Sequence, residues 1–487
     1  MKSLGDRKTK TVESAEAVDV VIIGGGIVGT VLAKALAEKV SPVDNSGLSV
    51  TLIDAADPEQ TSKSFEDFNP FTDTRVIALA RRTVNELAQM GLDLDNLAKQ
   101  HNGELPPQIK HIEVSDKGHL GLLNLESSDY HIEAFGQVVS LSALTRLAAN
   151  ASSSYQYIAP AKVTNVKQHR DFVEVQLDSG QSLKTKLLVL ADGGRSGLAE
   201  QVGITKTIAD YHQTAIVFNV HTQLPHKNKA YERFTENGPL AFLPFDSEID
   251  GVKAAGNGFS VVWTVETDAA KSLMALSEQA FIQALQEAFG YRQGKVLRVS
   301  ELASYPLALT KAEQVASHRT VLVGNAAQAL HPIAGQGFNL GLRDLSSLVS
   351  VLQAEAQKYT QQSALSNIES TLPNEALTSS SNSTLNSAQS ETNIIQNETN
   401  ASCNFDAGAF SITQHYANLR KADRDKTVVL TDTLVRTFSN QYFPTVIGRN
   451  VSLLALSMMP QAKKAFVKHT TGYGETSQKN RDNNATC

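Results

Sequence analysis

The fold is decided by Val18–Gly29, VDVVIIGGGIVG, where a mainly apolar run leads directly into a glycine cluster. The pattern predicts a buried strand, a tight turn and a helix from about Thr30 to Lys39. A second strand is expected over Leu48–Ile53, and Asp54 follows it. A strand, G-x-G-x-x-G, a helix, a strand and an acidic residue in this order are typical of a dinucleotide-binding unit.

Each of these residues has an expected physical role. Gly24 permits the tight turn, Gly26 lets a pyrophosphate approach the backbone, and Gly29 lets the helix pack closely on the strand. Asp54 is expected to accept hydrogen bonds from ribose hydroxyl groups. The gap between the glycines and this acid exceeds the usual ~20 residues, and the polar loop Ser41–Gly47 accounts for the excess.

A second glycine-rich stretch, Thr320–Asp344, reads TVLVGNAAQALHPIAGQGFNLGLRD. It predicts a buried strand that ends in a turn at Gly324, a rigid turn at Pro332, and a helix opened by Gly335–Asn339. Glycines at the start of a helix let a ligand approach unpaired N–H groups, which favour negative charge. The stretch therefore indicates a seat for a flat, anionic cofactor, although by itself it does not identify that cofactor.

Two further loops are candidates for the same site. A strand over Leu187–Leu190 ends at Asp192 and Gly193, and this acid could equally be a helix cap. Arg75 has the planar, paired donors that clamp a phosphate or carboxylate. Without other information, a surface arginine in a loop is the favoured interpretation of Arg75.

The chain is long enough for two or three domains. Residues 210–303 hold strands without intervening helices, which indicates an antiparallel sheet, and Trp263 is expected in its core. Residues 355–406 are dominated by Ser, Asn, Gln and Thr, and predict a disordered surface insertion between two helices. The expected division is a tail over 1–16, nucleotide-binding segments over 17–95, 136–205 and 304–354, substrate-side segments over 96–135 and 206–303, the insertion over 355–406, helices over 407–475 and a tail over 476–487.

Composition excludes several classes of protein. Hydrophobic content of 41% and a net charge of −6 fit a soluble globular chain, and no basic block indicates nucleic-acid binding. The two cysteines, Cys403 and Cys487, lie in polar surroundings, so neither a disulfide scaffold nor a cysteine-ligated metal is expected. No secretory signal or spanning helix is visible, which favours a cytoplasmic location.

The apolar stretch Val446–Met459 has two interpretations. Together with Lys463, Lys464 and Lys468 it could form a face for a membrane surface or a partner, over residues 446–468. Packing against the body of the protein is the commoner explanation for such a stretch.

Three motifs, namely Gly24/Gly26/Gly29, Asp192–Gly193 and Gly324–Asn339, are the first, middle and third motif. In their order and spacing they resemble the fingerprints of aromatic-hydroxylase flavoproteins. Within that group the chain is similar to the UbiH/UbiF/VisC family of FAD-dependent ubiquinone-biosynthesis hydroxylases. The segments that carry this closer resemblance are Val114–His119, Glu232–Thr235, Gly238–Leu240 and Tyr305–Thr310. One residue departs from the wider group, which usually has Asp where this chain has Asn325; its carbonyl oxygen can still accept from ribityl hydroxyls.

The resemblance implies a Rossmann-type FAD-binding domain of the aromatic-hydroxylase type, an interleaved antiparallel substrate domain and a helical C-terminal region. It also implies the site. Gly24, Gly26, Gly29 and Asp54 are expected to hold the ADP half of FAD, and Arg75 and Gln137 to contact its phosphate and ribityl region. Asp192 and Gly193 match the family's middle motif, which is expected to close over the cofactor, and Asn325 is expected to bind the ribityl hydroxyls. Pro332 is expected to face the isoalloxazine ring, and the segment with Gly335, Gly337, Phe338 and Asn339 to offer backbone N–H groups to its pyrimidine edge.

The implied activity is hydroxylation of a polyprenylated phenol of the 2-octaprenyl-6-methoxyphenol type, with NAD(P)H as transient reductant and molecular oxygen as co-substrate. The alternatives are a related flavin enzyme acting at another ring position or in a dehydrogenation, and a non-catalytic flavoprotein scaffold. Possible partners are other proteins of the pathway and the membrane surface, which residues 446–468 could contact peripherally. No catalytic residue is assigned, because His331 could either transfer a proton or hold the turn beside the flavin.

Overall fold

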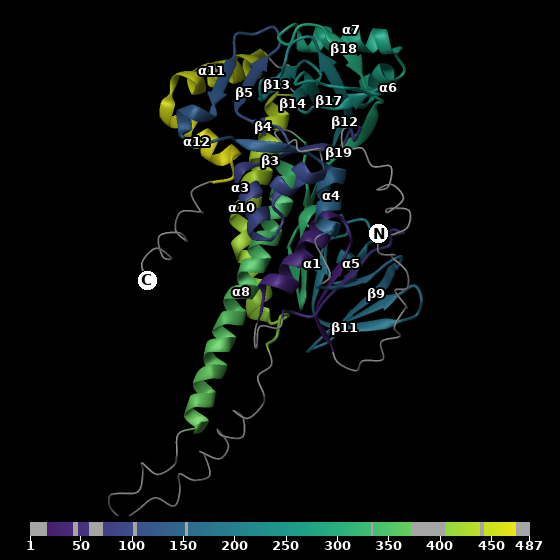
Figure 1. Cartoon of the computed structure of the whole chain (residues 1–487), viewed down its shortest axis with the longest axis vertical. Helices are drawn as coiled ribbons and strands as arrows, with labels where there is room; N and C mark the ends of the chain where they lie inside the picture. Colours follow the sequence, from purple (N-terminus) through teal and green to yellow (C-terminus); the bar gives the residue numbers. More distant parts are fainter. Residues whose placement is uncertain are drawn as a thin grey trace, which may run out of the picture.

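The computed structural model describes residues 17–41, 47–57, 72–100, 105–150, 154–332, 335–371, 405–438 and 443–473. Figure 1 shows an α/β body in the lower half, a second sheet above it, and helices α11 and α12 beside that second sheet. This arrangement confirms the predicted α/β class, in which a nucleotide-binding sheet is combined with an antiparallel sheet and a helical C-terminal region.

The first sheet is built around the strand that precedes the glycine cluster. β1 pairs in parallel with β11 and β2, and β21 and β8 continue the parallel order on the two sides. A hairpin of β9 and β10 and the short β20 are antiparallel additions. The strands are β1 (Val18–Ile23), β2 (Val50–Ile53), β8 (Gln156–Ile158), β9 (Val163–Gln168), β10 (Val173–Leu177), β11 (Ser182–Leu190), β20 (Ala316–Ser317) and β21 (Thr320–Leu322).

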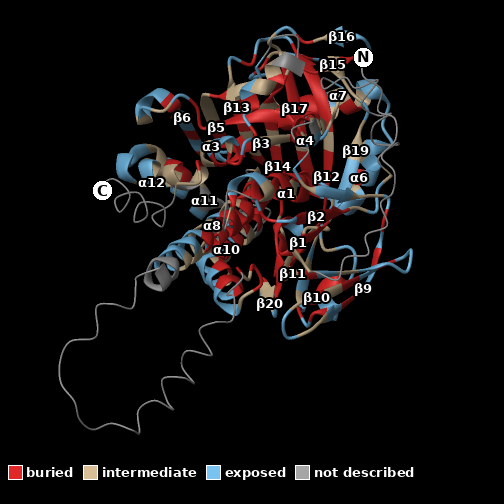
Figure 2. Cartoon of the chain, turned by 60° about the horizontal axis from the view of Figure 1, so that its bottom comes forward, coloured by how far each residue is buried: buried red, intermediate tan, exposed pale blue. Residues whose placement is uncertain are grey.

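Parallel strands covered on both faces read as continuous apolar runs, and the last four residues of β1, VVII, are all buried. Among the helices that share the core with these strands are α1 (Ile27–Lys39), α4 (Leu141–Asn150) and α8 (Gln336–Thr371). Figure 2 shows the result as a buried interior that follows the sheet and its helices.

The second sheet is antiparallel except where β13 meets β5, and its strands come from three separate parts of the chain. One face packs on α6 (Thr267–Met274) and α7 (Glu278–Phe289), where Trp263 lies buried against Phe281, as predicted. From one edge of this sheet to the other, the strands are β22 (Gln328–Ala329), β19 (Ala303–Ala312), β12 (Lys206–Thr222), β17 (Gly258–Glu266), β14 (Gly238–Pro244), β13 (Lys229–Thr235), β5 (His111–Asp116) and β6 (Leu122–Glu126). A further strand, β18 (Val296–Val299), pairs with β12.

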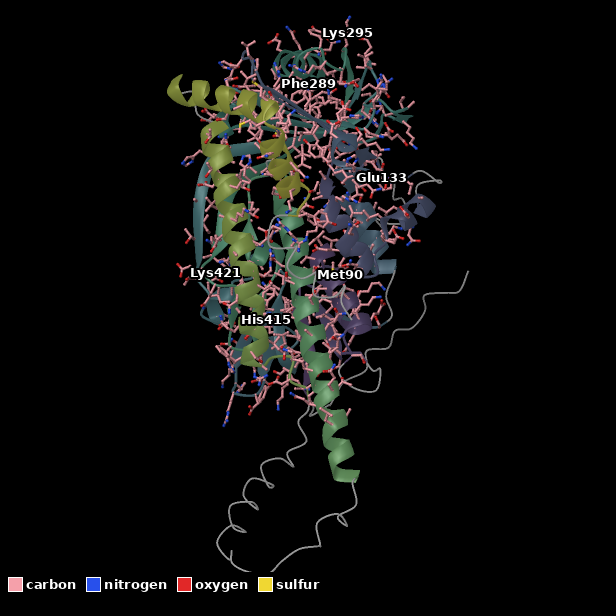
Figure 3. All side chains as sticks on the ribbon, turned by 90° about the vertical axis from the view of Figure 1, so that its left-hand side faces the viewer. Met90, Glu133, Phe289, Lys295, His415 and Lys421 are labelled. Carbon is pink, nitrogen blue, oxygen red and sulfur yellow. The ribbon has the colours of Figure 1, made fainter. Side chains whose placement is uncertain are left out.

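The other face of the second sheet packs on a small third sheet and on the C-terminal helices α11 (Phe443–Met458) and α12 (Pro460–Thr470). The third sheet consists of β3 (Val76–Ala80), β7 (Gly136–Ser140) and β4 (Gln108–Ile109). Figure 3 shows α10 (Phe410–Phe438), marked by His415 and Lys421, running beside α8. The remaining elements are α3 (Arg81–Gln89), α5 (Leu198–Gln201), the pair β15 (Glu248–Ile249) and β16 (Val252–Lys253), and 3₁₀ turns over Leu94–Gln100, Ser127–Tyr130 and Gly324–Ala326.

The structure corrects two of the predicted segment boundaries. β19 belongs to the second sheet, so the chain returns to the first sheet after Ala312 and not at residue 304. The predicted insertion does not begin at residue 355, since α8 continues to Thr371 and buries Ala356.

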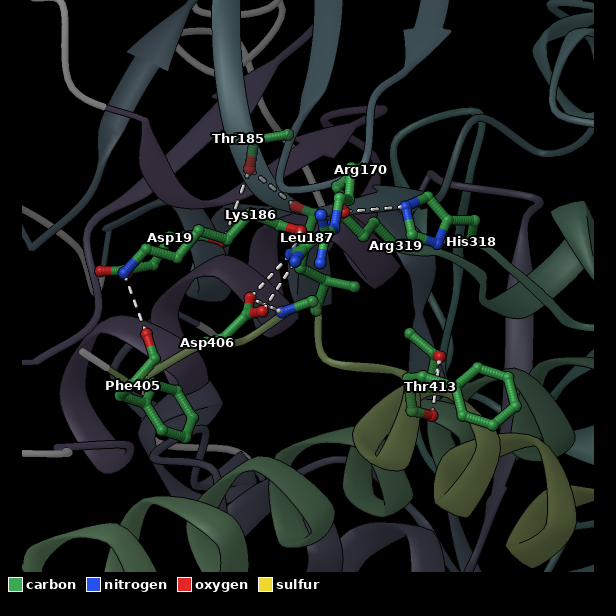
Figure 4. Close-up of polar contacts among 12 residues, drawn as sticks. Asp19, Arg170, Thr185, Lys186, Leu187, His318, Arg319, Phe405, Asp406 and Thr413 are labelled. Atoms are coloured by element: carbon green, nitrogen blue, oxygen red, sulfur yellow. Dashed lines mark hydrogen bonds and ion pairs between the residues drawn. The ribbon is translucent and has the colours of Figure 1, made fainter. Parts of the chain in front are cut away.

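The insertion also ends earlier than predicted. Phe405 is buried, and Asp406 accepts two hydrogen bonds of 2.7 Å from the guanidinium group of Arg319. Lys186 donates to the Phe405 carbonyl at 2.9 Å and pairs with Asp19 (Figure 4). The returning chain is therefore fastened to β1 and β11, and what is left of the predicted insertion, 372–404, lies outside the described residues.

The Arg319–Asp406 pair should contribute measurably to stability, because Arg319 is nearly buried. We expect Asp406→Ala to lower the free energy of unfolding by roughly 1–3 kcal/mol, since it leaves a buried charged donor without its acceptor. Chemical denaturation followed by circular dichroism measures the change. Asp268→Ala, which removes a highly exposed carboxylate paired with Lys271, is the matched control and should change stability by less than about 0.5 kcal/mol.

Candidate functional site

The first glycine cluster forms a turn in which backbone segments nearly touch. Gly24 has φ +110°, and a Cβ there would lie 2.5 Å from the Ala191 carbonyl oxygen. A Cβ on Gly29 would lie 1.9 Å from the Gly24 carbonyl oxygen, so this residue lets the helix pack closely, as expected. Gly26 differs, because a Cβ there would meet no atom within 4 Å. It leaves an open cradle at the N-terminus of α1.

The acidic residue after the second strand lies against the same turn. A Cβ on Gly25, which the sequence did not single out, would lie 2.4 Å from Oδ2 of Asp54, so a larger residue there would have to displace the Asp54 side chain. Asp54 lines the cavity beside the turn. Burial, and then the negative charge of Asp54, raises the pKa of the neighbouring Tyr157 to about 12.

The middle motif closes on itself. The two carboxylate oxygens of Asp192 accept from the backbone N–H groups of Gly194 and Ser196, each at 3.0 Å, and the Ser196 hydroxyl also donates to Asp192. The carboxylate therefore shapes its own loop, which is close to the capping role that the sequence left open. Asp192 and Gly193 nevertheless line the same cavity as Asp54.

Arg75 lines this cavity, whereas Gln137 does not. The Arg75 side chain is 58% exposed and lies 3.4 Å from Asp73. The Gln137 side chain is buried in β7 and donates to the Pro106 carbonyl at 3.3 Å, so its predicted contact with the cofactor is not supported. Two further cations, Lys162 and Arg195, line the cavity and were missed by the sequence analysis.

The third motif joins the two sheets. Gly324, with φ +61°, follows β21 of the first sheet, and β22 of the second sheet begins only four residues later. Asn325 is exposed toward the cavity that it lines. The amide of Asn339 is fully used within the protein: it accepts from Ala80 N–H at 2.8 Å and donates to the carbonyl oxygens of Ala78 and Gly335. The Asn339 side chain is thus a clamp between α8 and β3.

His331 is completely buried and lines neither the cavity beside the glycine turn nor the apolar cavity that adjoins it. Its ring lies 3.3 Å from Oε1 of Gln213 and packs edge-on to Tyr211 at 5.4 Å. Burial lowers the pKa of His331 to about 4, so the ring is neutral at neutral pH. These contacts favour the structural one of its two possible roles.

Two connected cavities result. The first, of about 930 Å³, is lined by all three motifs, including Gly24, Asp54, Asp192 and Asn325. The second, of about 680 Å³, is mainly apolar and lies between β3, the second sheet and helices α11 and α12. The two share Asn325, Gly337 and Phe338. Pro332, Gly335 and Asn339 line the second cavity, so a planar group held at the third motif would face both.

The lining of the first cavity suits a dinucleotide. A helix N-terminus beside the open cradle at Gly26 favours a pyrophosphate, and the nearby Arg75, Lys162 and Arg195 favour negative charge. Asp54 supplies acceptors for ribose hydroxyls. The exposed amide of Asn325 lies where a chain of hydroxyl groups would pass between the two cavities. The residues present therefore fit FAD.

The second cavity contains a residue to which the sequence analysis gave no role. Glu232 of β13 lines it among apolar side chains. Burial raises the pKa of Glu232 to about 7. In the strand segment AYERFT the acid alternates with Ala230 and Phe234, which was the available signal, but the sequence does not tell which face of the strand meets a cavity.

Comparisons with known proteins agree with this geometry. Residues 17–371 match the family model described as FAD binding domain. The chain is 33% identical over 460 residues to the ubiquinone hydroxylase UbiL of Rhodospirillum rubrum, covering 93% of this chain and 89% of that protein. It is 28% identical over 397 residues to the mitochondrial ubiquinone biosynthesis monooxygenase COQ6 of Danio rerio, covering 72% and 77%.

Among solved structures, the p-nitrophenol 4-monooxygenase PnpA of Pseudomonas putida superposes with a TM-score of 0.62 at 15% identity, covering 94% of this chain and 99% of that one. At this identity the likeness shows the fold. The match over residues 17–371 and the 33% identity over nearly the whole chain confirm the resemblance noted in the sequence. The chain belongs to the FAD-binding family of flavin-dependent monooxygenases that includes the ubiquinone-biosynthesis hydroxylases.

Proposed function

We propose that this FAD-dependent monooxygenase hydroxylates the aromatic ring of a polyprenylated phenol of the 2-octaprenyl-6-methoxyphenol type in ubiquinone biosynthesis, with NAD(P)H as reductant. The observation that carries the proposal is the apolar cavity of about 680 Å³ that opens from the third motif. Apolar pockets with a few polar groups bind and orient apolar ligands. The relatives UbiL and COQ6, whose names place them in ubiquinone synthesis, support the choice of substrate.

Each motif then has a role toward FAD. The cradle at Gly26 receives the pyrophosphate, with Gly24 and Gly29 fixing the turn, and Asp54 accepts from the ribose. Arg75 neutralises phosphate charge, while Asp192 and Gly193 hold the middle loop over the cofactor. Asn325 binds the ribityl chain. Pro332 and the backbone of Gly335, Gly337, Phe338 and Asn339 seat the ring.

When bound, FAD takes electrons from NAD(P)H and activates molecular oxygen for transfer of one atom to an electron-rich ring. The chain supplies position and excludes water. Apolar side chains from β5, β14 and α11, including Val114, Leu243 and Leu453, surround the space in front of the third motif. A dry cavity protects reactive species from hydrolysis and side reactions.

The prenyl tail requires a route out of the cavity. Leu453, Leu456 and Phe466, on α11 and α12, line the cavity. Leu454 and Met458 of α11, and Met459 between the two helices, are exposed, Met458 by 74%. We propose that this outward face, with Lys463 and Lys464 nearby, meets the membrane surface while the inward face holds the start of the tail. No helix among the described residues combines the length and hydropathy of a membrane-spanning segment.

The two alternatives stay open to the same experiment. A related hydroxylase would give a product oxygenated at another ring carbon, and a scaffold would bind FAD without turnover. Neither alternative has an observation of its own in its favour.

Gly26→Leu should abolish retention of FAD and leave the fold intact. Gly26 has φ −64° and open space around its Cβ, so the larger residue fits the protein but fills the cradle. Flavin absorbance per protein, with circular dichroism for folding, measures both effects. Gly448→Leu is the control, because Gly448 also has open space around its Cβ and lies outside both cavities. Stoichiometric FAD in folded Gly26→Leu would contradict this assignment of the cradle.

The purified FAD-loaded protein should consume oxygen and NAD(P)H together when given a polyprenylated phenol, and mass spectrometry should show a product heavier by one oxygen atom. With ¹⁸O₂ the added atom should carry the label, since one oxygen atom comes from the gas. Reductant oxidation without labelled product would contradict the hydroxylase activity. The position of the new hydroxyl, determined by NMR, separates this reaction from hydroxylation at another carbon.

Met458→Asp should weaken binding to vesicles of anionic lipid by roughly tenfold or more, because burial of a methionine side chain is worth about 1.5–3 kcal/mol. Co-sedimentation measures the bound fraction. Leu297→Asp is the matched control: Leu297 is 53% exposed, but it lies on β18 at the far side of the second sheet. An equal loss of vesicle binding in both variants, or no loss of binding in Met458→Asp, would argue against membrane contact through α11.

A further inference from the structure

The apolar cavity contains one carboxylic acid. Among the described residues that line it, Glu232 is the only acid, and no lysine, arginine or histidine accompanies it. The one other titratable side chain among the described lining residues, Tyr231, is hydrogen-bonded to Gln293 and packs edge-on to Phe289 at 5.4 Å. Its hydroxyl is thus engaged toward α7, on the opposite face of the sheet.

The register of β13 explains why this acid is alone. Side chains alternate between the two faces of a strand, and Glu232 shares its face with Ala230 and Phe234. Its partners across the sheet are Val114 on β5 and Ala241 on β14, both apolar.

The adjacent cation faces the other way. Arg233 donates to the Ala288 carbonyl at 3.0 Å and to the Ser115 hydroxyl at 3.3 Å. Across the described part of the chain, no donor lies within hydrogen-bond distance of the Glu232 carboxylate. An acid placed in an apolar cavity without a protein partner is suited to a partner that arrives with a ligand.

The surroundings tune this acid. The elements that face it across the cavity, β3, β5, β14, α8, α10, α11 and α12, contribute no charged side chain to the lining. Burial therefore acts alone and raises the pKa of Glu232 to about 7. A general base is most effective when its pKa lies near the working pH.

The cavity also places a ligand correctly. Pro332, Gly335 and Gly337, which belong to the seat for the flavin ring, line the same cavity as Glu232. A phenol bound there lies between the ring and the sheet, with its hydroxyl as the donor that Glu232 lacks. Building on the hydroxylase function proposed above, we propose that Glu232 is the catalytic base that accepts the hydrogen bond of the phenolic hydroxyl and takes its proton.

The step is a proton transfer. The phenolic O–H bond breaks and an O–H bond forms on a carboxylate oxygen of Glu232, with no change in oxidation state. The ring becomes a phenolate, which donates electron density to the carbon that receives oxygen. When that carbon has gained oxygen, its C–H bond breaks and the hydrogen leaves as a proton, which ends in the water formed from the second oxygen atom. The proton held by Glu232 then returns to the ring oxygen, so the base is regenerated without another reactant.

Glu232→Gln should keep FAD and lower product formation by roughly 100- to 10,000-fold, the usual contribution of a general base. Since the carboxylate form is lost as pH falls through about 7, product formation by the wild-type protein should rise with pH through that value. This limb should be absent in Glu232→Gln and partly restored in Glu232→Asp. Glu236→Gln, which alters an exposed carboxylate just beyond the same strand, is the control and should leave rate and pH profile unchanged. A Glu232→Gln protein with wild-type rate and profile would overturn the proposal.

A binding measurement on the oxidised wild-type protein tests the contact without turnover and without a variant that has to fold. A phenol with a short prenyl chain should bind more tightly than its O-methyl ether by about tenfold or more at pH 8, because a hydrogen bond to a charged acceptor is lost with the methyl group. This preference should shrink at pH 6, where the acid is protonated. Equal affinities for the phenol and for its O-methyl ether at both pH values would overturn the role of Glu232. A wild-type protein that shows the preference but yields no hydroxylated product would instead refute the proposed function alone.

Discussion

The buried carboxylate of Asp344 is the contact on which the rest of the site depends. One of its oxygens accepts from the Gly324 N–H at 3.0 Å and from the Gln328 side chain at 2.8 Å. The other accepts from Arg420 at 2.7 Å, and both side chains of this ion pair are almost inaccessible to water. Asp344 thus ties the third motif, at the point where it leaves the first sheet, to helices α8 and α10.

The ion pair is part of a larger cluster. Arg420 also bonds Asp423, which pairs with Arg343 of α8 at 2.6 Å. Burial alone would raise the pKa of Asp423, but Arg343 and Arg420 outweigh it and hold the pKa below its ordinary value. Breaking one partner of such a buried pair costs roughly 3–5 kcal/mol, although a well-packed apolar replacement of the whole pair is often neutral. The cluster therefore specifies where α10 lies against α8 more than it adds net stability.

The parts of the site that could be predicted are those fixed by the local backbone. Gly24 and Gly29 were readable because only glycine tolerates a carbonyl oxygen 1.9–2.5 Å from a Cβ position. The parts that could not be predicted depend on distant partners. The Gln137 side chain donates a hydrogen bond to the Pro106 carbonyl and so points away from the cavity. The amide of Asn339 is hydrogen-bonded to the backbone of Ala78 and Ala80, some 260 residues earlier. Residues 355–371 have a polar composition, yet they continue α8 because Ala356 is buried and Tyr359 packs on Phe405.

Two properties of the apolar cavity cannot be separated: its affinity for an apolar ligand and the raised pKa of Glu232. The apolar wall formed by Val114, Ala241 and Leu453 suits a prenylated ring, since removal of apolar surface from water drives its binding. The same wall removes water from the carboxyl group, and this desolvation raises its pKa toward neutrality. A more polar wall would bind the tail less well and would also return Glu232 to an ordinary, weaker base. In the proposed reaction, selection of the substrate and activation of its hydroxyl group therefore follow from one physical cause, the low polarity of the space in front of the third motif.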